Sequence, residues 1–289
     1  MTTVVQQLAA DVARIKRGLS ELLTRHSRIS PREESEYFIV ISAHGNNEWH
    51  ELSVEGRRVQ AAVKADYDHY SALVLVLIRR LTTDTLQQYE AAESTLRAFI
   101  EQSHSTWCDT PAQALAKAVE TLDSIQSLLE RLHSAEGEAI VVPDTNALLA
   151  APYLDRWQFA GLDHITVVLV PTILAELDEL KISHRNPDVR DKAKAVIGRI
   201  KEFLRRGDSH SGVPIMTGKI TLRTVATEPR MADSLPWFDA MNNDDRFLAS
   251  VIEQMRLNVR SNVQIVTEDI NLLNKATTAR ISVLEPPGT

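Results

Sequence analysis

Short apolar runs rich in β-branched residues constrain the fold of this chain's C-terminal half more than any other feature. The runs at residues 139–143, 167–171 and 263–266 have the length and composition of strands buried on both faces. Each of them continues into a stretch with the apolar spacing of a helix. Successive strand and helix units of this kind predict an α/β fold built on a parallel sheet.

Acidic residues stand at corresponding points of these units, either directly after a predicted strand or near the start of a predicted helix. Taken singly, each acid is also explained as an ordinary helix N-cap or as a solvated helix position. Taken together at one edge of a parallel sheet, they would repel one another unless a cation held them. The pattern therefore predicts a divalent-metal site. Its acidic residues are Asp144, Glu176, the pair Asp244 and Asp245, and Asp269.

Four sequence blocks around these acids resemble PIN-domain ribonucleases, in the same order as in that family. The blocks are VPDTNALL at 142–149, VPTILAELDELK at 170–181, NDDRFL at 243–248 and IVTEDINL at 265–272. The resemblance spans about residues 138 to 285. It implies a compact three-layer α/β/α domain with a parallel sheet over residues 137–289, and an acidic pocket that binds Mg²⁺ or Mn²⁺ for phosphodiester hydrolysis. The expected substrate is single-stranded RNA, cut internally.

The family's functional residues carry over to matching positions of this chain. Asp144, Glu176 and Asp269 match its first, second and last acids, and the third acid matches either Asp244 or Asp245. We expect direct metal ligation by the first and last of these acids, with the others completing the pocket through waters or a second ion. Two further residues match positions that often support the acids through hydrogen bonds. They are Asn146 and Thr267.

A local excess of basic residues lies between residues 181 and 206. It includes a predicted helix starting near Asp188, whose apolar stripe would leave the cations facing outward. Such a face is often only solvated or salt-bridged, but beside an acidic nuclease pocket it is also a candidate track for phosphates. The predicted phosphate contacts are Lys181, Arg185, Arg190 and Arg246.

The first 136 residues have the pattern of a mainly helical domain, to which nothing is carried over from the family. A heptad seam near the N-terminus would either pack within its own domain or form a homodimer. Further helices are predicted at residues 59–81, 84–102 and 111–133, a strand at 37–42, and a domain boundary at 134–138. This domain would serve targeting, oligomerisation or regulation, with an inhibitory or targeting protein as a further partner. The seam consists of Val5, Leu8, Val12, Ile15, Leu19 and Leu22.

Composition limits the functions that remain. The net charge of −7 means that any contact with nucleic acid is local. With Cys108 as the single cysteine, no intrachain disulfide forms, and without a long apolar run the chain is expected in the cytoplasm and not in a membrane. The nine histidines lack the paired spacing of zinc hydrolases, and no Gly-rich phosphate loop occurs.

Two other classes of function stay open. One is a PIN-like fold that binds RNA or a protein without cutting. The other is a different carboxylate-held Mg²⁺ enzyme, such as a phosphatase or a phospho-acceptor receiver. A phosphatase of the haloacid-dehalogenase type would need a second aspartate shortly after Asp144, and this chain has Thr145 and Asn146 there.

Overall fold

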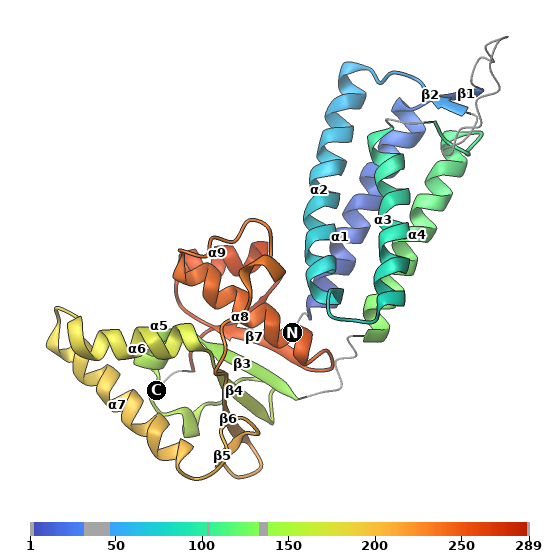
Figure 1. Ribbon diagram of the computed structural model, residues 1–289. Coiled ribbons are helices and arrows are strands. Elements are labelled where there is room, and N and C mark those ends of the chain that lie inside the picture. The colour runs from blue at the N-terminus through green and yellow to red at the C-terminus, as the bar shows by residue number, and fades with distance from the viewer. Residues whose placement is uncertain (1–2, 32–46, 103–104, 133–137, 288–289) are drawn as a thin grey trace. The chain divides into compact units, whose positions relative to one another are not determined.

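The computed structural model describes residues 3–31, 47–102, 105–132 and 138–287. The chain divides into two compact units, which cover Val5–Arg131 and Leu132–Thr289. The first unit is built from helices and the second from helices around a sheet (Figure 1).

The N-terminal unit is mainly helical, as the sequence predicts. In its described part, α1 continues into a single π-helical turn, Leu22–His26, and two short strands, β1 (Ile29–Pro31) and β2 (Asn47–Trp49), pair antiparallel. The strand predicted at residues 37–42 lies outside the described residues, as do residues 134–137 of the predicted boundary. The helices are α1 (Val4–Glu21), α2 (Val54–Ile78), α3 (Thr83–Glu101) and α4 (Pro111–Leu132).

The heptad seam packs inside this unit. All six of its apolar side chains are buried, between 0% and 6% exposed. Helix α2 begins five residues before the predicted start, because Ser53 caps it and its hydroxyl accepts a hydrogen bond from the Gly56 amide at 3.1 Å. The seam is thus used within the chain, and a homodimer of this unit needs another face.

The C-terminal unit contains a six-stranded sheet in the order β5-β6-β4-β3-β7-β8. Every pairing is parallel except that of β5 with β6. This confirms the predicted α/β fold, as a mixed sheet that is mostly parallel. The strands are β3 (Ala139–Pro143), β4 (Ile165–Leu169), β5 (Val213–Met216), β6 (Ile220–Thr224), β7 (Asn262–Val266) and β8 (Ser282–Leu284).

Residues 207–218 are rich in Gly, Ser, His and Pro, a composition that predicts a long loop. The structure places strand β5 within them, so that prediction is wrong. The strand is short and at the edge of the sheet, the position at which the missing amide hydrogen of Pro214 is tolerated. Turns close both ends, with positive φ at Gly212 (105°) and Gly218 (69°). At Gly212 an added Cβ would also lie only 2.7 Å from Thr221. The turn residues therefore predict a loop from the sequence, although the segment contains a strand.

Five helices accompany the sheet in the described residues. Figure 1 shows α5, α6 and α7 grouped together, with α8 and α9 forming a second group. Proline at the first turn of α6 and of α7 fits the free amide positions of a helix start. The helices are α5 (Thr145–Ala150), α6 (Pro171–Ser183), α7 (Pro187–Leu204), α8 (Asn243–Leu257) and α9 (Ile270–Thr278).

Strand β3 is the point at which the order of the strands reverses. The chain continues from β3 to β4 and β6 on one side, and later adds β7 and β8 on the other. In open α/β sheets, ligands bind in the crevice outside the carboxyl ends of the strands at such a switch point. The residue that follows β3 is Asp144.

Candidate active site

A pocket of about 750 Å³ lies at this switch point. Helices α5, α6, α8 and α9 all contribute side chains to its wall, so segments far apart in the sequence meet there. Residues 207–218 and 228–242 do not line it, whereas Asn243 at the start of α8 does. Of the residues predicted from the sequence, those that line the pocket are Asp144, Asn146, Glu176, Arg185, Asp244 and Asp269.

Asp144 is a buried carboxylate held in one orientation. It caps α5, and its Oδ1 accepts a hydrogen bond from the Ala147 amide at 2.6 Å. The Thr267 hydroxyl donates to its Oδ2. Burial raises the pKa of Asp144, the two hydrogen bonds oppose that rise, and the nearby charges of Asp269 and Glu176 add to it. A cation in the pocket would relieve the cost of keeping this group ionised.

Asp269 is tied to Asp144 through Thr267. The Thr267 hydroxyl that donates to Asp144 also accepts a hydrogen bond from the Asp269 amide at 2.9 Å. Asp269 in turn caps α9, with its Oδ1 accepting from the amides of Asn271 (2.7 Å) and Leu272 (3.1 Å). Both aspartates are therefore helix N-caps that also line the pocket.

Glu176 is oriented from α5. Its Oε2 accepts a hydrogen bond from the Thr145 hydroxyl at 2.6 Å. Glu179 also lines the pocket, a carboxylate that the sequence prediction missed. Its spacing of three residues from Glu176 places both on one helix face, and this was the available signal. Asn146 is exposed at the pocket wall.

The two neighbouring acids at the start of α8 take different positions. Asp244 lines the pocket, whereas Asp245 is buried and its Oδ2 accepts from the Asp239 amide at 2.9 Å. Lys275 of α9 pairs with both, at 2.8 Å from Asp245 and 3.2 Å from Asp244. Burial alone would lower the pKa of Lys275. The hydrogen bonds and charges of the two acids raise it by more than burial lowers it, so the pKa lies above its ordinary value. No local sequence pattern indicates Lys275, because its partners lie about thirty residues away on another helix.

Most of the predicted phosphate contacts have partners elsewhere. Arg185 lines the pocket. Lys181 pairs with Asp178 on the same helix, and Arg246 pairs with Glu228 at 2.7 Å. The Arg190 guanidinium donates to the His184 carbonyl at 2.6 Å, which closes the end of α6.

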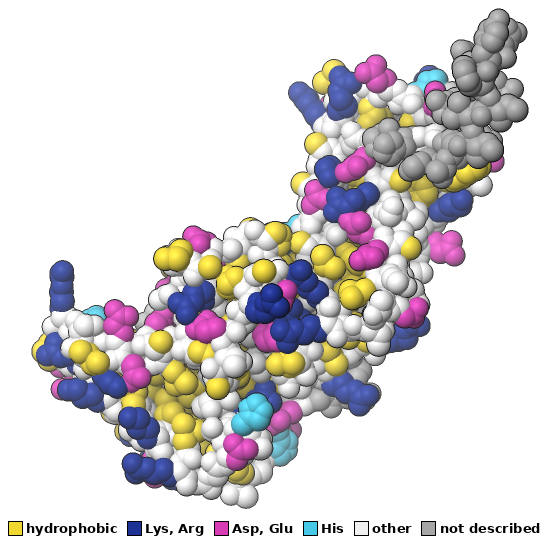
Figure 2. All heavy atoms as spheres, in the orientation of Figure 1, with side chains coloured by type: hydrophobic (Ala, Val, Ile, Leu, Met, Phe, Trp, Pro, Cys, Tyr) yellow, Lys and Arg dark blue, Asp and Glu magenta, His cyan; other side chains and the backbone are white. Residues whose placement is uncertain are grey.

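The outward cations of α7 do not form one continuous basic patch. Figure 2 shows Lys and Arg side chains over this helix interspersed with side chains of other types. Lys194 pairs with Asp191, Arg206 pairs with Glu202, and the Arg199 guanidinium lies 3.5 Å from the centre of the Tyr153 ring. The phosphate track along α7 stays a prediction, and several of its cations already contact neighbouring side chains.

The donor set of the pocket fits a partly hydrated hard cation. Within the described ranges, no three His, Cys, Asp or Glu side chains already surround one point closely enough to hold an ion unaided. Mg²⁺ usually keeps several waters and takes one or two carboxylates together with substrate phosphate. Asp144, Glu176 and Asp269 supply such oxygens, and no described Lys, Arg or His lies within ion-pair distance of them.

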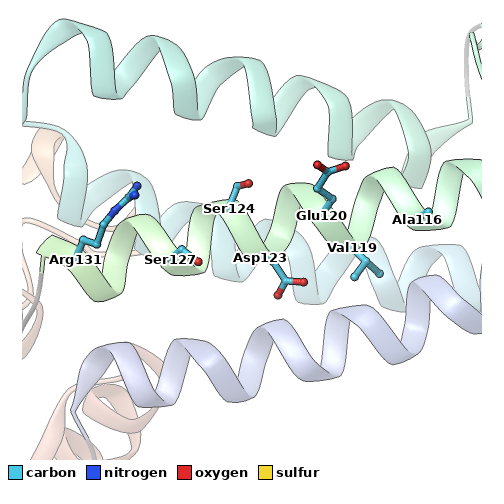
Figure 3. A pocket seen from close by; sticks show the side chains of 7 residues that line it. All are labelled: Ala116, Val119, Glu120, Asp123, Ser124, Ser127 and Arg131. Atoms are coloured by element: carbon cyan, nitrogen blue, oxygen red, sulfur yellow. The ribbon is translucent and has the colours of Figure 1, made fainter.

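A second hollow, of about 650 Å³, lies on the surface of α4. It is lined by residues of that one helix, and its two acids, Glu120 and Asp123, point away from each other (Figure 3). Asp123 pairs with Lys16 of α1. This hollow brings no reactive groups together, so the acidic pocket of the C-terminal unit is the better candidate site.

Comparison with known proteins agrees with the fold and the pocket. The family model described as PIN domain matches residues 141–286, half of the chain, and the chain therefore belongs to the PIN-domain family. Members of this family are generally nucleases and typically use divalent metals. No curated protein matches the chain. Among the described residues, no helix is long and apolar enough to cross a membrane.

Proposed function

We propose that residues 137–289 form a metal-dependent endoribonuclease domain that hydrolyses single-stranded RNA. The observation that carries this proposal is the pocket at the switch point. There the buried Asp144, Glu176 and Asp269, from three segments, have no ion-pair partner among the residues that the structure describes. Carboxylate oxygens are the ligands that Mg²⁺ and Mn²⁺ prefer.

Asp144 and Asp269 would hold the ion, since Thr267 links them and both side chains are fixed by hydrogen bonds. Such fixed ligands need little reorganisation when the reaction begins. A bound Mg²⁺ or Mn²⁺ supplies an activated water and neutralises charge that develops on the phosphate. Glu176 would orient water from the wall of the pocket, and Arg185 would contact a phosphate oxygen.

Asp244 is the better choice for the third acid of the site. It lines the pocket, whereas Asp245 is turned toward the Asp239 amide and Lys275. We propose that Asp244 acts on bound water or substrate and that Asp245 holds the start of α8 in place.

For the helical domain, residues 1–136, we propose a role in targeting, oligomerisation or regulation, through an inhibitory or targeting protein or through a homodimer. The heptad seam is buried within this unit, so either partner would use its outer surface. The proposed location is the cytoplasm.

The test is cleavage of a labelled circular single-stranded RNA by the full chain with added Mn²⁺ or Mg²⁺. A circle has no ends, so only an endonuclease cuts it. Asp144→Asn and Asp269→Asn keep the shape and the capping oxygen of the side chain but remove its charge. We expect each to lower the cleavage rate at least about a hundredfold. Asp163→Asn, on the surface outside the pocket, is the matched control and should cut normally.

Metal-dependent cutting that both variants lose supports the proposal. Wild-type protein that binds Mn²⁺ and RNA but leaves RNA uncut under all these conditions would instead support the binding role that the fold also allows.

A further inference from the structure

Lys275 is the basic residue most closely engaged with the acids of the pocket. Its Nζ lies 2.8 Å from Asp245 Oδ1, 2.9 Å from Asn242 Oδ1 and 3.2 Å from Asp244 Oδ2. An ammonium group has three hydrogens to donate. Each of the three hydrogens therefore has an oxygen partner. These oxygens surround the Lys275 ammonium as they would surround a bound metal cation.

These contacts join the two helices that flank one side of the pocket. Lys275 belongs to α9, which begins at Asp269, whereas its three partners lie at the start of α8. The Lys275 side chain is 32% exposed and that of Asp245 only 10%. The positive charge is thus fixed at the pocket edge by a carboxylate that has little access to water.

The acids around the pocket fall into two groups that differ in charge balance. Asp144, Glu176 and Asp269 have no described basic partner within ion-pair distance. In the second group, Lys275 offsets one of the two negative charges of Asp244 and Asp245. The need for an external cation is therefore greater in the first group.

A second divalent ion would have to compete with Lys275 for the same oxygen atoms. Asp244 is the acid of this pair that lines the pocket, and its Oδ2 already accepts from the ammonium. Displacing the ammonium would leave the buried Asp245 carboxylate without its cation, which costs free energy. If the ammonium stayed, its positive charge would repel a divalent cation beside it.

We propose that Lys275 occupies with its ammonium group the place that a second divalent cation would need, so that the pocket takes its ion only at Asp144 and Asp269. Lys275 is then a positioning residue that sets the metal content of the site. The nature of the ion rests on the proposed function. The exclusion of a second ion depends on Lys275, Asp244 and Asp245.

The test counts Mn²⁺ ions bound per chain, by calorimetric titration and by the loss of the free Mn²⁺ signal in electron paramagnetic resonance. Lys275→Gln removes the charge but keeps a side chain that donates hydrogen bonds. Lys64→Gln is the matched control, because it removes the same charge from a lysine of the helical unit that likewise pairs with two carboxylates, those of Asp68 and Glu101. We expect one ion in the wild type and the control, and two in Lys275→Gln. Adding Asp244→Asn to that variant should return the count to one.

Two ions in the wild type, or an unchanged count in folded Lys275→Gln, would overturn the inference. If the single variant does not fold, Lys275→Gln with Asp245→Asn removes the buried charge together with its partner, and the expected count is again two. The two proposals fail separately. Lack of any ion in the wild type counts against the nuclease, whereas the difference of one ion between variant and wild type decides the role of Lys275.

Discussion

The two units of the chain each bury an aspartate and hold it in opposite ways. Asp11 in α1 is 1% exposed, and the Arg14 guanidinium lies 2.8 Å from its carboxylate and 3.0 Å from that of Asp66. Asp144 is 6% exposed and is held by a hydroxyl and an amide. The helical unit supplies its own cation, whereas no described cation of the PIN domain lies within ion-pair distance of Asp144. Lack of a basic partner thus distinguishes the acid proposed for catalysis from the structural one.

The same contrast recurs within the pocket. Asp245 resembles Asp11, because it is buried and paired with a cation of the chain, Lys275. Asp144 lines the pocket, and no described residue pairs with it as a cation. If this contrast is correct, removing the Arg14 cation should destabilise the helical unit around Asp11. Removing the Asp144 carboxylate should leave the metal-free PIN domain folded.

The largest effect is expected from Arg14→Met. It leaves the Asp11 carboxylate buried without its guanidinium, and we expect a loss of about 3 kcal/mol in the free energy of unfolding. Urea unfolding followed by circular dichroism measures it. Arg58→Met is the control, since Arg58 and its partner Glu55 are both exposed, and it should cost less than about 1 kcal/mol. Equal losses in the two variants would contradict the structural role of Arg14.

Next in size is the effect of metal on the PIN domain. Mn²⁺ at about a hundred times its dissociation constant should stabilise the folded chain by about 2.7 kcal/mol, since it binds the folded state preferentially. Thermal unfolding with and without Mn²⁺ measures the shift. Asp144→Asn should abolish the shift, and Asp163→Asn should keep it. A shift that survives in Asp144→Asn places the ion elsewhere.

A smaller effect is expected from Thr267→Val, which keeps the shape of the side chain but removes the hydroxyl between Asp144 and Asp269. We expect a loss of about 1 to 2 kcal/mol in stability and at least about tenfold in Mn²⁺ affinity. Thr277→Val is the control, because its hydroxyl contacts only a carbonyl of its own helix. Unchanged Mn²⁺ affinity in Thr267→Val would remove Thr267 from the site.

The smallest effect is the pH dependence of the metal-free protein. The folded state raises the pKa of Asp144, so folding favours its protonated form. The stability that this group contributes is therefore present at acid pH and is lost as the pH rises through the raised pKa. In chelator, wild-type protein should lose stability relative to Asp144→Asn as the pH rises from about 4 to 7. A trend in the opposite direction would mean that the pocket stabilises the ionised carboxylate by itself.

The sequence predicted the two aspartates of the site that lie at junctions between a strand and the helix that follows it. Asp144 and Asp269 stand where a buried β-branched strand meets a helix, and both elements are recognisable within a few residues. Parallel strands end at one edge of the sheet, so these two acids were expected to lie together. The structure places both at the pocket.

Contacts between distant elements were beyond the reach of the sequence. Asp244 and Asp245 are adjacent in the first turn of α8, and contacts of Asp245 with the Asp239 amide and with Lys275 of α9 distinguish it from Asp244, which lines the pocket. Lys275 reaches both acids from α9. Strand β5 was missed because its pairing with β6 outweighs a local pattern dominated by turn residues.

The most direct measurement is a crystal structure of the full chain soaked in Mn²⁺, with the ion located by its anomalous scattering. The account predicts one peak, beside the carboxylates of Asp144 and Asp269, with the Lys275 ammonium still on Asp244 and Asp245. A peak between Asp244 and Asp245, or none at Asp144, would contradict it.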